Sequence, residues 1–171
     1  MRIFLIGFMC SGKSTVGGRL APMLGLPFLD LDRVIEAQVG PLLPYIRDQG
    51  EALFREQEAR ALAALLNGPP AVIATGGGTP CEGEHLRRML QAGLVVYLDV
   101  PYATLMERII RSGGDRPLLF GLQGEALAGR VRDLLQARRP YYTAAHLHVD
   151  GTGTAEEVAV RIKRAIDGQT R

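Results

Sequence analysis

The sequence predicts an α/β domain with a parallel sheet. Short apolar runs alternate along the chain with stretches of helical periodicity, and there is no internal repeat or low-complexity linker. The first apolar run, residues 2–6, leads directly into a glycine-rich loop at 7–15, and helix-forming residues follow up to 24. A strand, a loop and a helix in this order form the opening unit of such a sheet.

Length and composition predict one globular domain covering residues 1–171. The chain is 47% hydrophobic and 22% charged, and its net charge of +2 favours neither nucleic acid nor a membrane surface as a partner. Two cysteines are too few for a disulfide framework, and the three histidines form no metal motif. Because the chain starts directly with the first strand and has no long apolar run, we expect a cytoplasmic protein, and we take it to be a monomer.

The glycine-rich loop predicts a binding site for a nucleoside triphosphate. Residues 7–15 fit the pattern G-x-x-x-x-G-K-[ST] in full, and the strand and helix that this pattern requires flank them. Backbone N–H groups of such a loop and the N-terminus of the following helix bind phosphate oxygens. We expect Lys13 to reach the β- and γ-phosphates and Ser14 to ligate the accompanying Mg²⁺. The rest of the predicted nucleotide-binding loop is Cys10, Ser11, Gly12 and Thr15.

Strands and helices continue to alternate after this unit. A short strand at 27–29 ends in Asp30 and Asp32, and residues 33–66 are interpreted as a helical insertion whose longest helix is 51–66. A third strand at 71–74 runs into three glycines, which imply a close approach of the backbone to another group. The remaining predicted elements are a helix at 84–91, a strand at 94–98, helices at 102–111 and 125–139, a strand at 146–149 and a helix at 154–166.

Residues 112–124 are expected to form a lid loop. Four glycines surround a single arginine, Arg116, in this stretch, a composition that suits a mobile segment. An arginine guanidinium group can donate two parallel hydrogen bonds to a phosphate or carboxylate group. Arginines from separate segments could therefore together hold an anionic acceptor and a phosphoryl group; the candidates are Arg55, Arg116 and either Arg138 or Arg139. For each arginine taken alone, a solvated helix face is the alternative.

Two places on the chain offer a carboxylate at a strand end. Asp99 follows the strand at 94–98 as in a conventional metal-binding strand, whereas Asp30 and Asp32 are spaced to point the same way from extended backbone. We favour the pair, because only the pair offers one carboxylate for the metal and another for an acceptor hydroxyl. Asp99 is then interpreted as a helix cap or surface acid.

A set of motifs resembles the shikimate kinases over nearly the whole chain. Besides the loop at 7–15 it comprises Asp30-x-Asp32, Phe54-Arg55-x-x-Glu58, Gly76-Gly77-Gly78, Arg116-Pro117-Leu118-Leu119 and Arg138-x-Pro140-x-Tyr142. The resemblance implies a three-layer P-loop NTPase fold with a five-stranded parallel sheet in the order 2-3-1-4-5 and helices on both faces. It implies ATP-dependent phosphorylation of the 3-hydroxyl group of shikimate, with Mg²⁺, a step of chorismate and aromatic amino acid biosynthesis.

The resemblance also assigns roles to residues. Asp32 would hold the 3-hydroxyl group of shikimate, and Arg55 and Arg138 its carboxylate. Arg116 would close over the phosphates as a catalytic residue together with Lys13 and Asp32. The remaining implied contacts are those of Gly76, Gly77 and Gly78 with the shikimate ring, of Asp30 with Mg²⁺ through water beside Ser14, and of Arg111 with adenine.

The chain departs from the family pattern in two places. Cys10 stands where shikimate kinases usually have glycine, which matters if the residue adopts a positive φ. Pro41 and Pro44 fall in a stretch that is usually helical in the family, so we predict a shortened or broken helix there. The histidines and the two tyrosines at 141–142 are interpreted as surface or packing residues.

Two other functions stay open at this stage. A related small-molecule kinase, such as a gluconate kinase, shares the phosphate loop but should lack the combined Phe54-Arg55 and Arg138-x-Pro140-x-Tyr142 elements. A non-enzymatic nucleotide-binding protein or switch needs no acceptor site, and the chain lacks the Asn-Lys-x-Asp guanine motif of GTPase switches. Release of ADP that depends on a small acceptor would distinguish a kinase from a binding protein.

Overall fold

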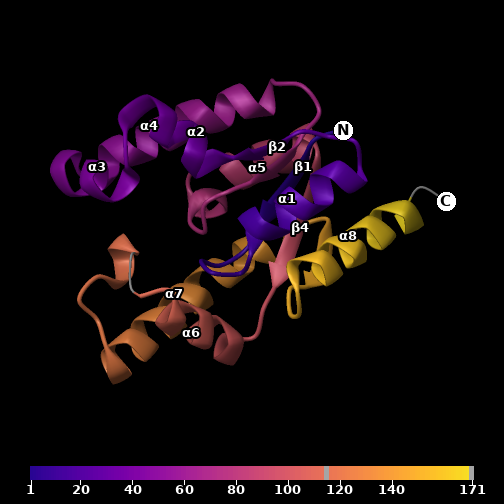
Figure 1. Ribbon diagram of the computed structural model, residues 1–171. Helices are drawn as coiled ribbons and strands as arrows, with labels where there is room; N and C mark the ends of the chain where they lie inside the picture. The colour runs from indigo at the N-terminus through magenta and orange to yellow at the C-terminus, as the bar shows by residue number, and fades with distance from the viewer. Residues whose placement is uncertain (114–115, 170–171) are drawn as a thin grey trace.

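Five parallel strands form the central layer of the protein (Figure 1). The computed structural model describes residues 1–113 and 116–169. The strands are β1 (Ile3–Ile6), β2 (Phe28–Asp30), β3 (Val72–Ala74), β4 (Leu94–Asp99) and β5 (Leu147–Asp150), and their order in the sheet is β2-β3-β1-β4-β5. This order confirms the predicted topology. It puts β1, and the loop that follows it, at the middle of the sheet.

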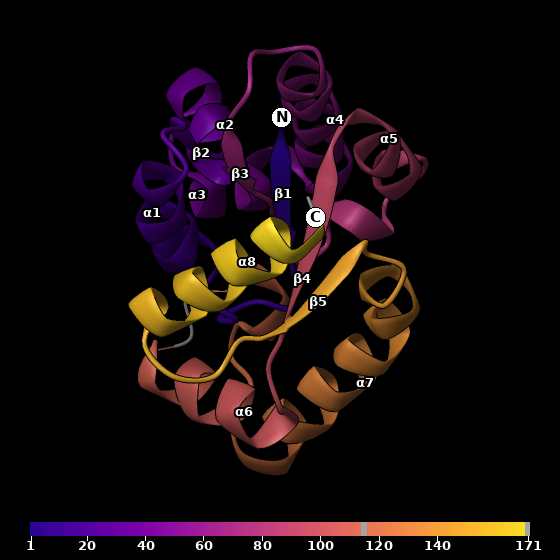
Figure 2. The ribbon, with the colours of Figure 1, turned by 90° about the vertical axis from the view of Figure 1, so that its right-hand side faces the viewer.

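Helices cover both faces of the sheet because alternate strand residues point to opposite sides. In β1, Ile3 and Leu5 pack into the core under α1 (Lys13–Met23) and α8 (Ala155–Gln169). Phe4 and Ile6 pack into the second core, under the helices of the opposite face. Figure 2 shows α8 crossing the strands on the first face. The helices of the opposite face are α4 (Glu51–Leu66), α5 (His85–Ala92), α6 (Tyr102–Arg111) and α7 (Gly124–Tyr142).

The segment between β2 and β3 is helical, as expected, but it starts earlier than residue 33. It consists of α2 (Leu31–Val39), α3 (Leu42–Gln49) and α4. The break predicted from the prolines lies between α2 and α3, where Gly40 adopts a φ of 84° and Pro41 precedes the first residue of α3. Pro44 is tolerated because it occupies the first turn of α3, where a backbone N–H has no acceptor within the helix.

The lid and the helix after it differ from the prediction. Gly114 and Asp115 of the expected lid loop lie outside the described residues, and Pro117–Leu119 form a short 3₁₀ turn, η2, where we expected no regular structure. Helix α7 does not end at Arg139 but continues through Pro140 to Tyr142. Complete burial of the Tyr142 side chain compensates for the backbone hydrogen bond that a proline removes.

The other elements lie within two residues of their predicted ends, except that α8 continues to Gln169, three residues beyond its predicted end. A second 3₁₀ turn, η1 (Thr79–Cys81), follows the three glycines. Across residues 1–113 and 116–169, no helix is both long enough and apolar enough to cross a membrane.

Candidate active site

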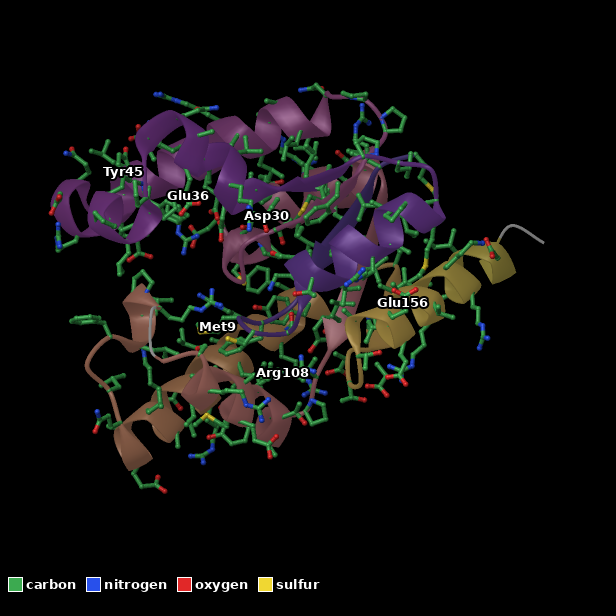
Figure 3. All side chains as sticks on the ribbon, viewed as in Figure 1. Met9, Asp30, Glu36, Tyr45, Arg108 and Glu156 are labelled. Atoms are coloured by element: carbon green, nitrogen blue, oxygen red, sulfur yellow. The ribbon has the colours of Figure 1, made fainter. Side chains whose placement is uncertain are left out.

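Two adjoining cavities open at the carboxyl ends of β1, β2 and β3. The first, of about 490 Å³, is lined by the loop after β1, and the second, of about 460 Å³, by residues of α3, α4 and α7 and by residues 116–118. In Figure 3, Met9, Asp30 and Arg108 gather around the first cavity from three separate elements. The residues that line both cavities are Met9, Asp32, Gly76, Gly77 and Arg116.

The loop between β1 and α1 has the conformation of a phosphate-binding loop. Gly12 caps α1 with a φ of 94°. A Cβ on Gly7 would lie 2.9 Å from Ser11 Oγ and 3.0 Å from the carbonyl oxygen of Leu98, so only glycine fits there. The N-terminus of α1 therefore opens toward the first cavity, as an anion site requires. The predicted loop residues that line this cavity are Cys10, Ser11, Gly12, Lys13, Ser14 and Thr15.

Lys13 is buried within this loop. Its Nζ donates hydrogen bonds of 2.8 Å to the carbonyl oxygens of Gly7 and Phe8. Burial lowers the pKa of the Lys13 ammonium to about 8, and the nearby Asp32 carboxylate opposes that shift. The ammonium is thus held on the cavity wall, next to the place where phosphate oxygens would neutralise it.

Cys10 adopts a φ of 60°, and among the described residues it is the one non-glycine residue with a positive φ. The position at which the family usually has glycine therefore does require the left-handed region. The carbonyl oxygen of Cys10 accepts a hydrogen bond of 3.2 Å from Arg108 Nη1, and its thiol lies 3.6 Å from Arg116 Nη2. Cys10 thus joins the phosphate loop to α6 and to the lid.

Asp30 and Ser14 lie in contact at the floor of the first cavity. The Ser14 hydroxyl donates a hydrogen bond to Asp30 Oδ2, while Oδ1 caps α2 by accepting from the backbone N–H groups of Asp32 (3.0 Å) and Arg33 (3.4 Å). Among the described residues, no group of three or more His, Cys, Asp or Glu side chains could hold a metal. Two hard oxygen donors beside a phosphate site nevertheless fit Mg²⁺, which takes few protein ligands when a nucleotide supplies others.

Asp32 lines both cavities, but its backbone is not extended as its spacing from Asp30 predicted. It belongs to the first turn of α2 rather than to extended backbone, because Asp30 ends the strand and caps the helix. The first turn of a helix ordinarily favours an ionised carboxylate. Here burial, and secondly the neighbouring Asp30, raise the pKa of Asp32 to about 6. A carboxylate that accepts a proton near neutral pH can act as a general base.

Arg55 and Arg138 converge on the second cavity from α4 and α7. A Cβ on Gly78 would lie 2.9 Å from Arg55 Nη2 and 3.1 Å from Arg138 Nη2, and one on Gly77 would lie 3.2 Å from Arg138 Nη1. The glycine run, with Gly76, is therefore what lets the two guanidinium groups approach each other. Two guanidinium groups that face one cavity have the geometry that can bind a carboxylate.

Glu58 holds Arg55 in place, a role that we did not assign from the sequence. Its carboxylate is buried and accepts hydrogen bonds from Arg55 Nη1 (2.9 Å) and Thr79 Oγ1 (2.7 Å). Burial alone would lower the pKa of Arg55, but Glu58, with Glu82 and Glu51, raises it. The i, i+3 spacing of Arg55 and Glu58 on one helix is the signal that could have revealed this pair.

Arg108, rather than Arg111, lines the nucleotide side of the site. Its Nη2 donates to the carbonyl oxygen of Gly151 (3.3 Å) in the loop before α8, so it links that loop to Cys10. Arg111 is exposed at the end of α6 and lines neither cavity. Asp99 lies outside both cavities and accepts a hydrogen bond of 3.1 Å from the Tyr97 hydroxyl.

Comparison with known proteins identifies the family. The family model for shikimate kinase matches residues 9–167. A shikimate kinase of Salinibacter ruber is 41% identical, over 99% of this chain and 86% of its own. The structure of an Acinetobacter baumannii shikimate kinase in complex with shikimate has a TM-score of 0.90 and 36% identity, covering 98% of this chain and 93% of the other.

A gluconokinase from Sinorhizobium meliloti shares the fold, with a TM-score of 0.62, but is only 19% identical, over 99% of this chain and 97% of the other. Similarity at that level speaks for a common architecture alone. The family match, in contrast, extends over nearly all the elements that build the two cavities. The chain belongs to the shikimate kinase family, kinases that phosphorylate an alcohol group of shikimate with ATP.

Proposed function

We propose that this protein transfers the γ-phosphoryl group of ATP to the 3-hydroxyl group of shikimate. The observation that carries the proposal is the position of Asp32, which lines both the cavity of the phosphate loop and the cavity of the paired arginines. A hydroxyl group held by Asp32 would face a phosphoryl group held by the loop, so the two reacting groups would be brought into line.

On the nucleotide side, the loop N–H groups and the α1 N-terminus bind the phosphates, and Lys13 neutralises charge that develops on the γ-phosphoryl group. Arg116 lines both cavities and adds a second positive charge from the lid. Ser14 and Asp30 would hold Mg²⁺, Asp30 through water, and the ion would supply further neutralisation of the phosphate oxygens. Arg108 supports the nucleotide loop, and adenine binds near Gly151, which lines the same cavity.

On the acceptor side, Arg55 and Arg138 hold the carboxylate of shikimate while Asp32 orients and deprotonates its 3-hydroxyl group. Shikimate is a small triol carboxylate, so one carboxylate and two arginine forks match its polar groups. Residues 33–66 act as the substrate-binding segment. Closure of residues 112–124 over the site excludes water and limits hydrolysis of ATP.

The deciding experiment is ATP turnover with shikimate, quinate, gluconate and AMP compared side by side, with and without Mg²⁺. We expect ADP release that depends on shikimate and on Mg²⁺, and a much smaller response to the other three acceptors. Release that depends on gluconate instead would support a gluconate kinase, and no acceptor-dependent release from folded protein would support a binding protein.

Arg55→Lys tests the carboxylate site within that assay. Lysine keeps the positive charge but loses the two-point fork, so we expect the KM for shikimate to rise about 10- to 100-fold, the effect of losing one charge-assisted hydrogen bond. The KM for ATP should stay unchanged. Arg60→Lys is the matched control, since Arg60 lies exposed on the same helix and lines neither cavity. Equal losses for both substrates would instead place Arg55 at the phosphates.

A further inference from the structure

Tyr142 of α7 makes a hydrogen bond to the glycine run, residues 76–78. It lies in the last turn of α7 with its side chain fully buried, and its hydroxyl donates a hydrogen bond of 2.6 Å to the carbonyl oxygen of Gly77, 65 residues away in the chain. Tyr142 lines neither cavity, whereas Gly77 lines both. Burial raises the pKa of the Tyr142 hydroxyl well above its usual range, so the group stays protonated and acts as the donor.

This hydrogen bond determines the direction of the next N–H group. In a trans peptide the carbonyl of one residue and the N–H of the following residue point in opposite directions, and no described peptide bond is cis. With the Gly77 carbonyl turned toward Tyr142, the Gly78 N–H points away from the Tyr142 hydroxyl, and Gly78 lines the second cavity. No described backbone oxygen accepts from this N–H.

The peptide between Gly77 and Gly78 needs such an anchor. Neither glycine has a side chain that would restrict its backbone, so the peptide plane could rotate at low cost. The turn itself is closed by bonds from Thr79 N to Gly76 O (3.2 Å) and from Cys81 N to Gly78 O (2.9 Å), and neither bond involves this peptide. In the described part of the chain, the Tyr142 hydroxyl is the group that holds it.

The ring of Tyr142 is itself held firmly. It stacks on Tyr97 of β4, with ring centroids 5.3 Å apart and an angle of 23° between the planes. One turn earlier on the same helix, Arg138 points into the second cavity. The i, i+4 spacing puts Arg138 and Tyr142 on the same face of α7, and both residues therefore approach the glycine run from this helix.

We infer that Tyr142 is a positioning residue for the acceptor: its hydroxyl holds the Gly77–Gly78 peptide so that the Gly78 N–H donates to an oxygen of the bound substrate. The inference rests on the proposed function of the second cavity. It extends that function by assigning to Tyr142, which does not line the cavity, the orientation of a backbone donor beside the two arginine side chains.

Tyr142→Phe tests the inference, because phenylalanine keeps the stacked ring and removes the hydroxyl that donates to Gly77. We expect the KM for shikimate to rise about 3- to 10-fold, the effect of one misplaced neutral hydrogen bond, while the KM for ATP stays within about twofold of the wild type. Tyr97→Phe is the matched control: it removes a hydroxyl from the partner ring of the same stack, and that hydroxyl bonds Asp99 outside both cavities. It should leave both KM values unchanged.

A second measurement observes the Gly78 N–H directly. In the ¹⁵N NMR spectrum of the wild-type protein, addition of shikimate should shift the Gly78 amide resonance strongly, and in Tyr142→Phe the shift should shrink. An unaffected Gly78 amide, an unchanged KM for shikimate in a folded Tyr142→Phe variant, or an equal rise in both KM values would each overturn the inference. Failure of the wild type to phosphorylate shikimate is a different result, which would remove the proposed function itself.

Discussion

Asp32→Asn should abolish most activity and yet make the protein more stable. Burial and the neighbouring Asp30 raise the pKa of Asp32 from 3.8 to about 6, which means that the folded state resists ionisation of this carboxyl group. At neutral pH the carboxyl is nevertheless ionised in both the folded and the unfolded protein. The folded state therefore carries an unfavourable charge that asparagine, of nearly the same shape, removes.

The pKa shift gives the magnitude. A rise from 3.8 to about 6 corresponds to about 3 kcal/mol at about 1.4 kcal/mol for each pKa unit. This value already includes the attraction of Asp32 to the buried Lys13 ammonium, which lowers the pKa of Asp32. It is an upper bound because the asparagine amide is itself a buried polar group, whose desolvation costs free energy. We expect the variant to be more stable by about 1–3 kcal/mol, a rise in Tm of about 3–10 °C for a domain of this size.

The pH dependence separates this cause from better packing. The folded protein takes up a proton at Asp32 below about pH 6, whereas the unfolded chain does so only near its ordinary pKa of 3.8. Wild-type stability thus falls as pH rises through this window, and the advantage of Asp32→Asn should grow from nearly zero below pH 4 to its full value above pH 6.

Calorimetric melts of both proteins between pH 4 and pH 8 measure this advantage, and turnover in the same buffers should show kcat/KM for shikimate falling by about 10²- to 10⁴-fold in the variant. A variant that melts no higher than the wild type at pH 8 would refute the reasoning. A gain of equal size at pH 4 and pH 8 would refute it as well.

Two further substitutions have defined outcomes. Cys10→Gly should raise stability by about 1 kcal/mol, because glycine adopts the φ of 60° found at this position without the Cβ penalty; a Tm equal to or below that of the wild type in a thermal melt would contradict this. Glu58→Gln should raise the KM for shikimate several-fold and lower stability by about 1–3 kcal/mol, because Arg55 loses the buried charge that holds it. Steady-state kinetics and denaturant unfolding check the two effects, and an unchanged KM would show that Arg55 needs no such support.

The sheet could be predicted from sequence because its strands are buried on both faces. β1, β3 and β4 are apolar runs bounded by loop residues, and such runs are distinctive. The ends of helices could not be predicted where tertiary packing overrides the local conformational preference of the residues. Pro140 suggested that α7 ends before it, whereas burial of Tyr142 keeps the last turn helical. Asp30 likewise serves as both strand end and helix cap, which brought α2 forward to Leu31.

The site residues that could be predicted from the sequence are those that belong to short sequence motifs. Lys13 and Asp32 stand in short motifs, so their position at the cavities could be anticipated. The hydrogen bond from Arg108 to the backbone carbonyl of Cys10 joins residues 98 positions apart. A bond to a backbone atom does not depend on the acceptor's side chain, so no sequence motif predicts it. The contact of Tyr142 with Gly77 is of the same kind. Groups that bind backbone atoms at long range thus remained hidden until the fold brought them together.

The unfavourable features of this protein gather where the two cavities meet. Cys10 has a left-handed backbone, Lys13 and Asp32 are charged groups whose pKa values burial shifts toward neutrality, and Arg55 Nε is buried with no described hydrogen-bond partner. A sequence selected for stability alone would remove each of them. Ligand binding would relieve two of them, because phosphate oxygens would neutralise Lys13 and an acceptor carboxylate would accept hydrogen bonds from the Arg55 guanidinium. Binding of nucleotide and acceptor should therefore stabilise the folded protein, since it acts on charged groups that the fold buries.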